Sequence, residues 1–215
     1  MRRAMKLTVF GATGATGEQI VRAGLAAGHE VTAVVRRPDA MRVADPELRV
    51  VAGDVLQTES LPPGVAGAGA VLSALGARAM RRPTTVYSAG TAAVLGAMRE
   101  AGVRRFVGIT AAPVGPRAQQ SPLDRYLVHP LLWWAFGPVY EDMRRMETLV
   151  AASDRDWTVF RPPRLTHAAA TGRYRLAVDA PLPRAWTISR ADLAAAMVAA
   201  VRDSTTVGHT VSIAA

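Results

Sequence analysis

The stretch GATGATG at residues 11–17 lies between a short apolar segment, Lys6–Phe10, and a segment with helical spacing, Glu18–Ala27. Glycines at a turn from strand to helix permit positive φ angles and leave room for a ligand to approach the backbone. The start of the helix then offers unpaired N–H groups and the positive end of its dipole to a phosphate. This order of elements predicts a βαβ unit that binds the pyrophosphate of a dinucleotide.

Outward from this turn, short apolar segments alternate with helical ones. Further strands are predicted at Val31–Val35, Leu48–Val51, Ala70–Ser73, Phe106–Thr110 and Trp157–Phe160. Further helices are predicted at Thr84–Ala101, Tyr140–Ser153 and Arg190–Arg202. The alternation predicts an α/β single-domain Rossmann fold over residues 1–215, with a doubly wound parallel sheet and helices on both faces. Two irregular, proline-bearing insertions on the substrate side are expected near 111–138 and 166–183.

Two arginines, Arg36 and Arg37, follow the second predicted strand directly. Sites specific for NAD usually have an acidic residue there to hold the ribose hydroxyls, whereas arginine neutralises a 2′-phosphate. The alternative is that both are ordinary solvated side chains, as an arginine-rich chain would show anyway. We expect NADP(H) to be preferred over NAD(H).

Composition excludes several classes of protein. Half of the 215 residues are hydrophobic, which suits one domain with a full core. The chain has no cysteine, so disulfides and thiolate chemistry are excluded, and no metal site is predicted. Its net charge is +9, but the arginines are scattered, so nucleic-acid binding is not expected. No apolar run reaches the ~20 residues that span a bilayer, so we expect a cytoplasmic protein without a membrane partner.

The pattern G-A-T-G-x-T-G resembles that of the atypical short-chain dehydrogenases/reductases, in the NAD(P)H-binding (NmrA-like) group. The biliverdin reductase B/flavin reductase family is the most similar within it. The resemblance extends nearly from end to end of the chain. It is also carried by Gly53-Asp54-Val55-Leu56-Gln57, Leu75-Gly76, Pro83-Thr84-Thr85-Val86, Arg145-Met146, Pro162-Pro163, Thr171-Gly172, Ile188-Ser189 and Asp192-Leu193.

The resemblance implies which residues contact the cofactor. Asp54 and Val55 would face the adenine, Thr110 would lie near the nicotinamide, and Pro163 would close over it. The complete expected NADP(H) site comprises Gly11, Thr13, Gly14, Ala15, Thr16, Gly17, Arg36, Arg37, Asp54, Val55, Leu75, Gly76, Arg78, Thr110 and Pro163.

The chain departs from the chemistry of typical relatives. The usual tyrosine acid with a lysine four residues later is absent, because Lys6 is the only lysine. Tyr140 with Arg144 could substitute for that pair, or Tyr140 could be structural, since alignment places the usual pair at Val139 and Met143.

The serine and histidine of the biliverdin/flavin reductases are replaced here by Ala111 and Arg164. The candidate catalytic residues are therefore Thr110 and Arg164, with Arg164 stabilising negative charge on the acceptor. Arg164 could equally be a surface residue or a ligand of a cofactor phosphate. His167 could donate a proton, although a loop histidine is more often ordinary surface.

An apolar stretch, Leu127–Phe136, has no assigned role. It could form a lid over a flat substrate, a contact in a homodimer, or a simple core helix.

Two functions remain open at this stage. The first is an NADPH-dependent oxidoreductase that transfers hydride to a small planar or carbonyl-bearing acceptor, such as a flavin, quinone or enone. The second is a non-catalytic NADP(H)-sensing regulatory protein of NmrA type, favoured by the loss of the familiar proton donors. An isomerase with bound NADP⁺ is a third reading, weakened by the missing base.

Overall fold

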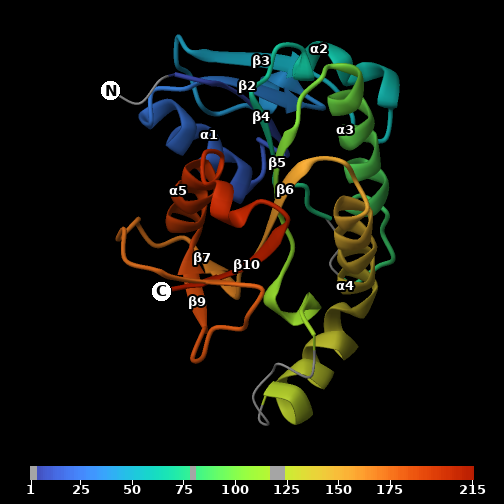
Figure 1. Cartoon of the computed structure of the whole chain (residues 1–215), viewed down its shortest axis with the longest axis vertical. Coiled ribbons are helices and arrows are strands. Elements are labelled where there is room, and N and C mark those ends of the chain that lie inside the picture. The colour runs from blue at the N-terminus through green and yellow to red at the C-terminus, as the bar shows by residue number, and fades with distance from the viewer. Residues whose placement is uncertain (1–3, 78–80, 117–123) are drawn as a thin grey trace.

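The computed structural model describes residues 4–77, 81–116 and 124–215. Its centre is an eight-stranded sheet with the order β3-β2-β1-β4-β5-β6-β10-β8 (Figure 1). In that order the strands are Leu48–Ala52, Glu30–Val35, Lys6–Phe10, Ala70–Ser73, Arg105–Ile109, Asp156–Arg161, His209–Ala214 and Arg175–Val178. All neighbouring pairs are parallel except β10 and β8. Two short strands, β7 (Arg164–Thr166) and β9 (Thr187–Ser189), pair separately.

Helices cover both faces of this sheet. The helices α1 (Ala15–Ala26) and α5 (Arg190–Ala200) pack on one face, and α3 (Ser88–Glu100) and α4 (His129–Ala151) pack on the other (Figure 1). The short α2 (Pro62–Val65) belongs to the second layer. Single turns lie at Pro38–Ala40, Thr58–Ser60, Ala112–Val114, Asp124–Val128 and Ser204–Thr206. The arrangement confirms the predicted doubly wound fold.

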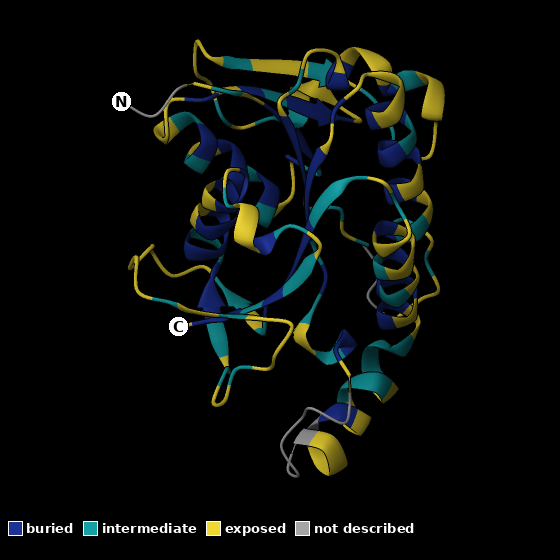
Figure 2. Cartoon of the chain, in the orientation of Figure 1, coloured by how far each residue is buried: buried dark blue, intermediate teal, exposed yellow. Residues whose placement is uncertain are grey.

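Successive residues of the central strands supply both layers of core. Leu7 and Val9 of β1 pack with α1 and α5, whereas Phe10 packs with α3 and α4. Phe106 and Val107 of β5 divide between the layers in the same way. Strands buried on both faces read as continuous apolar runs, which is why this sheet could be recognised from sequence. Figure 2 shows the buried strands between the two helical layers.

The C-terminal part of the chain is tied together by Asp192, which is 1% exposed. Its carboxylate accepts hydrogen bonds from the amides of Thr171 and Gly172 and from the hydroxyl of Ser189, the N-cap of α5. Burial, the largest single influence, disfavours the charged form, but these hydrogen bonds together outweigh it and lower the pKa of Asp192. The Thr171-Gly172 and Ser189…Asp192 motifs therefore have a structural explanation.

Several predicted boundaries were wrong. The helix α1 begins at Ala15 rather than Glu18, and α3 begins at Ser88 rather than Thr84. The expectation of irregular structure fails for 129–138, which is the first part of α4. Pro130 fits there because the first turn of a helix needs no N–H donor. The strand β8 lies within the predicted irregular segment 166–183, and β10 was not predicted at all.

Among the described helices, none is both long enough and apolar enough to cross a bilayer. The same residues contain no group of three or more His, Asp or Glu side chains placed to hold a metal ion.

Candidate functional site

The glycine-rich turn lies where the order of the strands reverses. From β1 the chain proceeds outward to β2 and β3, and it then returns to β4 on the other side of β1. In a doubly wound sheet, ligands bind at such a switch point, beyond the carboxyl ends of the strands. The turn Gly11–Gly14 leaves the end of β1 there and leads directly into α1.

Two glycines of the turn are required by the backbone itself. Gly11 has a φ of +73°, and a Cβ on it would lie 2.3 Å from the carbonyl oxygen of Ala74. A Cβ on Gly17 would lie 2.1 Å from the carbonyl oxygen of Gly11. These contacts bring the turn close to the segment after β4 and to the first turn of α1. Gly14 is less constrained. A Cβ on it would lie 3.2 Å from the carbonyl oxygen of Gly11, and its φ is −79°.

The start of α1 is open to a ligand. Gly14 is the N-cap and has no side-chain oxygen, so no side chain caps the first turn of this helix. Thr13, Gly14 and Ala15 are exposed. The carboxylate in the first turn, Glu18, is paired with Arg22 through a contact of 2.9 Å. The helix therefore presents its amide N–H groups and its positive dipole end to solvent at the switch point, as a phosphate site requires.

Arg36 and Arg37 lie at the same edge of the sheet. β2 pairs with β1 so that Val34 lies beside Phe10, and the two arginines follow immediately after Val35. Both are exposed, and neither forms an ion pair with a residue that the structure describes. Two guanidinium groups are thus available one strand away from the phosphate-binding turn.

Asp54 and Val55 begin the loop after β3, next to β2. The Asp54 carboxylate accepts a hydrogen bond from the amide of Leu56 at 3.0 Å, and the Asp54 amide donates to the hydroxyl of Ser60 at 2.9 Å. Val55 packs against α3, because a Cβ added to Gly90 would lie 2.9 Å from its side chain. This loop has a defined shape at the carboxyl edge of the sheet.

The segment after β4, which contains Leu75 and Gly76, is held from two sides. The amide of Ala74 donates to the carbonyl of Phe10, and the amide of Ala77 donates to the hydroxyl of Tyr87 at 3.2 Å. Burial raises the pKa of Tyr87, so this phenol stays protonated. Arg78 lies outside the described residues.

Behind Tyr87 lies Asp142, a fully buried carboxylate on α4 that the sequence reasoning missed. It accepts hydrogen bonds from the amides of Tyr87 at 2.9 Å and Ser88 at 3.3 Å, and from the hydroxyl of Ser88. Asp142 therefore caps the start of α3 from a neighbouring helix. Since the partners are 54 or 55 residues apart, no local pattern could have indicated this contact.

At the end of β5 the structure shows a polar cluster around Thr110. The Thr110 side chain is buried, and its hydroxyl donates to Glu147 at 2.7 Å. Glu147 is in turn held by Arg161 through two contacts of 2.9 and 2.7 Å. The hydroxyl of Thr110 thus already has a carboxylate partner, which favours a role in shaping the site over one in proton transfer. Glu147 and Arg161 were not predicted as site residues.

Tyr140 and Arg144 do not form a catalytic pair. Arg144 lies over the ring of Trp133, 4.2 Å from its centroid, and donates to the carbonyl of Val114. Tyr140 is buried beside Trp133 and Phe136. Burial raises its pKa, and the nearby Tyr87 raises it further. A catalytic tyrosine needs the opposite shift, so Tyr140 is a structural residue.

The remaining predicted residues follow β6. Pro163 is half-buried, and Arg164 is exposed at the first position of β7. His167 is exposed beyond β7. The carbonyl of Pro162 accepts a hydrogen bond from the amide of Ala112, which joins this segment to the one after Thr110. The structure thus brings Thr110 and the two prolines to the same edge, while Arg164 points into solvent.

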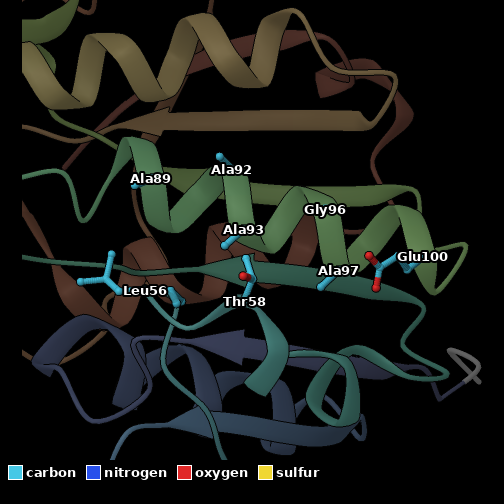
Figure 3. Close-up of a pocket in the computed structure, with 9 residues that line it drawn as sticks. Leu56, Thr58, Ala89, Ala92, Ala93, Gly96, Ala97 and Glu100 are labelled. Atoms are coloured by element: carbon cyan, nitrogen blue, oxygen red, sulfur yellow. The ribbon is translucent and has the colours of Figure 1, made fainter.

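An open groove of about 490 Å³ runs along α3 (Figure 3). One side is the small-residue face of α3 from Ala89 to Glu100, and the other is the loop with Leu56 and Thr58. Only its Val55–Ala89 end adjoins the predicted adenine contacts. The groove has no arginine or lysine in its described lining, so it is not suited to phosphates.

Known proteins agree with this geometry. Residues 11–204 match the NAD(P)H-binding family. A 3-diazoavenalumate denitrifying reductase from a Streptomyces species is 34% identical over 73% of this chain. The match covers 55% of the length of that reductase, so this chain spans about half of it. A putative NADH-flavin reductase from Streptococcus pneumoniae superposes with a TM-score of 0.80 at 22% identity, covering 98% of this chain and 99% of that one.

A short-chain dehydrogenase/reductase from Veillonella parvula, solved in complex with NADP, superposes with a TM-score of 0.79 at 15% identity. The superposition covers 99% of this chain and 95% of the Veillonella chain. At such identities the two structural matches establish the Rossmann fold alone. The match of residues 11–204 establishes more, and this chain belongs to the NAD(P)H-binding family of Rossmann-fold proteins, in agreement with its resemblance to the atypical short-chain dehydrogenases/reductases.

Proposed function

We propose that the chain is an NADPH-dependent reductase that transfers hydride to a small planar or carbonyl-bearing acceptor, such as a flavin, quinone or enone. The proposal depends on one observation: the uncapped start of α1 and the exposed Arg36 and Arg37 lie at the same edge of the sheet, at its switch point. Family membership and a reductase relative support the reaction class. A cytoplasmic location stays a prediction.

Different residues would contact different parts of the cofactor. The first-turn amides of α1, with Thr13 and Thr16, would hold the pyrophosphate. Asp54 and Val55 would lie against the adenine, and Leu75 and Gly76 would line the cofactor beyond β4. Bound NADPH would supply the hydride, and the protein's part is to orient the nicotinamide near Thr110 and Pro163 and to exclude water.

Proton delivery by Tyr87 or Tyr140 is not part of this proposal, because both are buried and burial raises their pKa values. An acceptor such as a flavin or quinone can take its proton from water once hydride has arrived. Arg164, exposed at the start of β7, would stabilise negative charge on such an acceptor if the acceptor binds at that end of the sheet.

Cofactor preference is the first prediction. The double variant Arg36→Ala/Arg37→Ala should weaken NADPH binding by roughly 30- to 100-fold, because it removes charge-assisted contacts to the 2′-phosphate. NADH binding should change by less than about twofold. Both can be measured by titrating the nucleotide fluorescence.

Arg49→Ala is the matched control, since Arg49 is an exposed arginine at the second position of β3, away from the carboxyl edge. It should leave both affinities unchanged. Equal affinity of the unaltered protein for NADPH and NADH would contradict the assignment of NADP(H).

Turnover separates the reductase from the second candidate, a sensor of NADP(H) without catalysis. A panel of flavins, quinones and enones should include at least one acceptor that accelerates NADPH oxidation above the rate without protein. Tight NADPH binding with no turnover on any acceptor, together with capture of a partner protein that depends on NADPH, would favour the sensor.

A further inference from the structure

The first part of α4 carries apolar side chains on its exposed side as well as its packed one. From Tyr126 to Tyr140 the sequence contains no Asp, Glu, Lys or Arg. Tyr126, Leu127, Leu131 and Trp134 are 72%, 63%, 62% and 80% exposed. We call these four residues the apolar tip. They recur at helical spacing, so they lie along one side of the helical segment.

The packed side of the same segment contacts the rest of the protein through three apolar residues. Leu132, Trp133 and Phe136 pack against the core layer of α3 and α4. The indole N–H of Trp133 donates to the carbonyl of Pro113 at 3.2 Å, and Arg144 covers its ring. The apolar tip therefore cannot turn inward without breaking these contacts. A helix with apolar side chains on all sides is normally buried on all sides, so the exposed side is expected to contact another apolar surface.

The position of the tip restricts what that surrounding is. The segment forms the lower end of the molecule along its longest axis, beyond the edge of the sheet (Figure 1). It is a narrow projection with exposed residues along it (Figure 2). A narrow projection can insert into the surface of a lipid bilayer. It offers a flat protein partner less buried area than a stable protein–protein interface needs.

Several arginines lie in the same half of the molecule as the tip. Arg125 lies directly before Tyr126 and directly after Asp124. The segment that holds β7 and β9 lies in the same lower half of the molecule, and its Arg164, Arg173 and Arg184 are exposed (Figure 1). None of these three forms an ion pair with a described residue. The acid in this segment, Asp179, is paired with His209.

We propose that the apolar tip docks the protein on the surface of an anionic lipid bilayer. Trp, Tyr and Leu are the residues that favour the interface between headgroups and acyl chains. The net charge of +9 on the chain favours its approach to anionic headgroups. A second copy of this chain fits less well, because each copy carries a net charge of +9. Contact with one leaflet needs no spanning helix, so the length argument against a membrane partner does not apply to it.

Vesicle cosedimentation tests this proposal on the full chain. Sucrose-loaded vesicles of equal parts phosphatidylcholine and phosphatidylglycerol should pellet the protein, and vesicles of phosphatidylcholine alone should pellet at least about tenfold less. The double variant Leu131→Gln/Trp134→Ser should reduce binding to the anionic vesicles by about tenfold or more. Leu149→Gln, an exposed leucine in the last turns of the same helix, is the control and should bind as the unaltered protein does.

Thermal unfolding checks that the double variant is folded, which is expected because both side chains are exposed. Three results would overturn the proposal: no pelleting with anionic vesicles, equal pelleting with neutral ones, or full binding by the double variant. A dimer in solution that the double variant separates, without vesicle binding, would instead assign the tip to a second copy. None of these readouts depends on NADPH or turnover.

Discussion

Replacing Gly11 by alanine should abolish NADPH binding and lower the free energy of unfolding by about 3 kcal/mol or more. Two costs combine at this position. Its φ of +73° is unfavourable for any residue with a Cβ, and that Cβ would lie 2.3 Å from the carbonyl oxygen of Ala74. The clash is with backbone, so relief would separate the turn from the segment after β4, and both belong to the proposed cofactor site. Urea unfolding and fluorescence titration with NADPH measure the two effects.

Two other glycines separate the costs. Gly28 has a φ of +77° but nothing within 4 Å of an added Cβ, so Gly28→Ala should cost only about 1–2 kcal/mol. Gly96 lies inside α3 with equally open space, and Gly96→Ala should be neutral or should stabilise by up to about 1 kcal/mol. Both should keep their NADPH affinity. If Gly11→Ala were as stable as Gly28→Ala, the close approach of turn and β4 segment would be wrong.

The contrast among these glycines shows what the sequence could and could not reveal about the fold. The glycine turn and the buried parallel strands were predictable, because their signals are local: a strand, a turn and a helix in order, and apolar runs of fixed length. β10 was missed because only Val211 and Ile213 alternate in it with polar residues. Its strand character comes from pairing with β6 and β8, which are distant in sequence.

The first part of α4 was expected to be irregular, although a core helix over Leu127–Phe136 was one of the alternatives left open. Pro130, Gly137 and Pro138 are signals for helix ends, and they lie within a stretch that is helical. Pro138 has no N–H to donate to the carbonyl of Trp134, so the helix lacks one backbone hydrogen bond in its interior and is less stable there. The contacts of Trp133 and Phe136 with the core layer offset it. Tertiary packing thus overrode the local preference.

The candidate site divides in the same way. The phosphate-binding turn and the arginines after β2 could be identified from sequence, since each follows directly from a strand end. The residues that hold the site in shape could not. Glu147 and Arg161 come from a helix and a strand, and their relation to Thr110 is visible only when the sheet is assembled. The sequence also offered Tyr140 with Arg144 as a possible catalytic pair, but both side chains contact the ring of Trp133 instead.

Asp142→Ala should lower the free energy of unfolding by about 3–5 kcal/mol, the second large effect that we expect. The carboxylate is fully buried, and its removal would leave the amides of Tyr87 and Ser88 and the hydroxyl of Ser88 without their acceptor. A buried donor without an acceptor destabilises the folded state by the full free energy of its lost hydration. Urea unfolding measures the loss directly.

Two substitutions show that burial and hydrogen bonding, rather than charge on α4 in general, cause this loss. Asp142→Asn keeps one acceptor oxygen and should cost about half as much. Glu141→Gln alters the adjacent residue, which is exposed and has only a 3.7 Å pair with Arg145, so the free energy of unfolding should stay within about 0.5 kcal/mol. A loss below about 1 kcal/mol for Asp142→Ala would mean that water can reach the start of α3.

The same variants connect stability to the site. Asp142 fixes Tyr87, and the hydroxyl of Tyr87 holds the amide of Ala77 in the segment that follows β4. If this chain of contacts positions the cofactor segment, Asp142→Asn should weaken NADPH binding several-fold at a temperature where it is fully folded. Tyr87→Phe, which removes only the last hydrogen bond, should weaken it by a similar factor while costing about 1 kcal/mol of stability. Unchanged NADPH affinity in both variants would confine Asp142 to capping α3, because the segment would then hold its position without them.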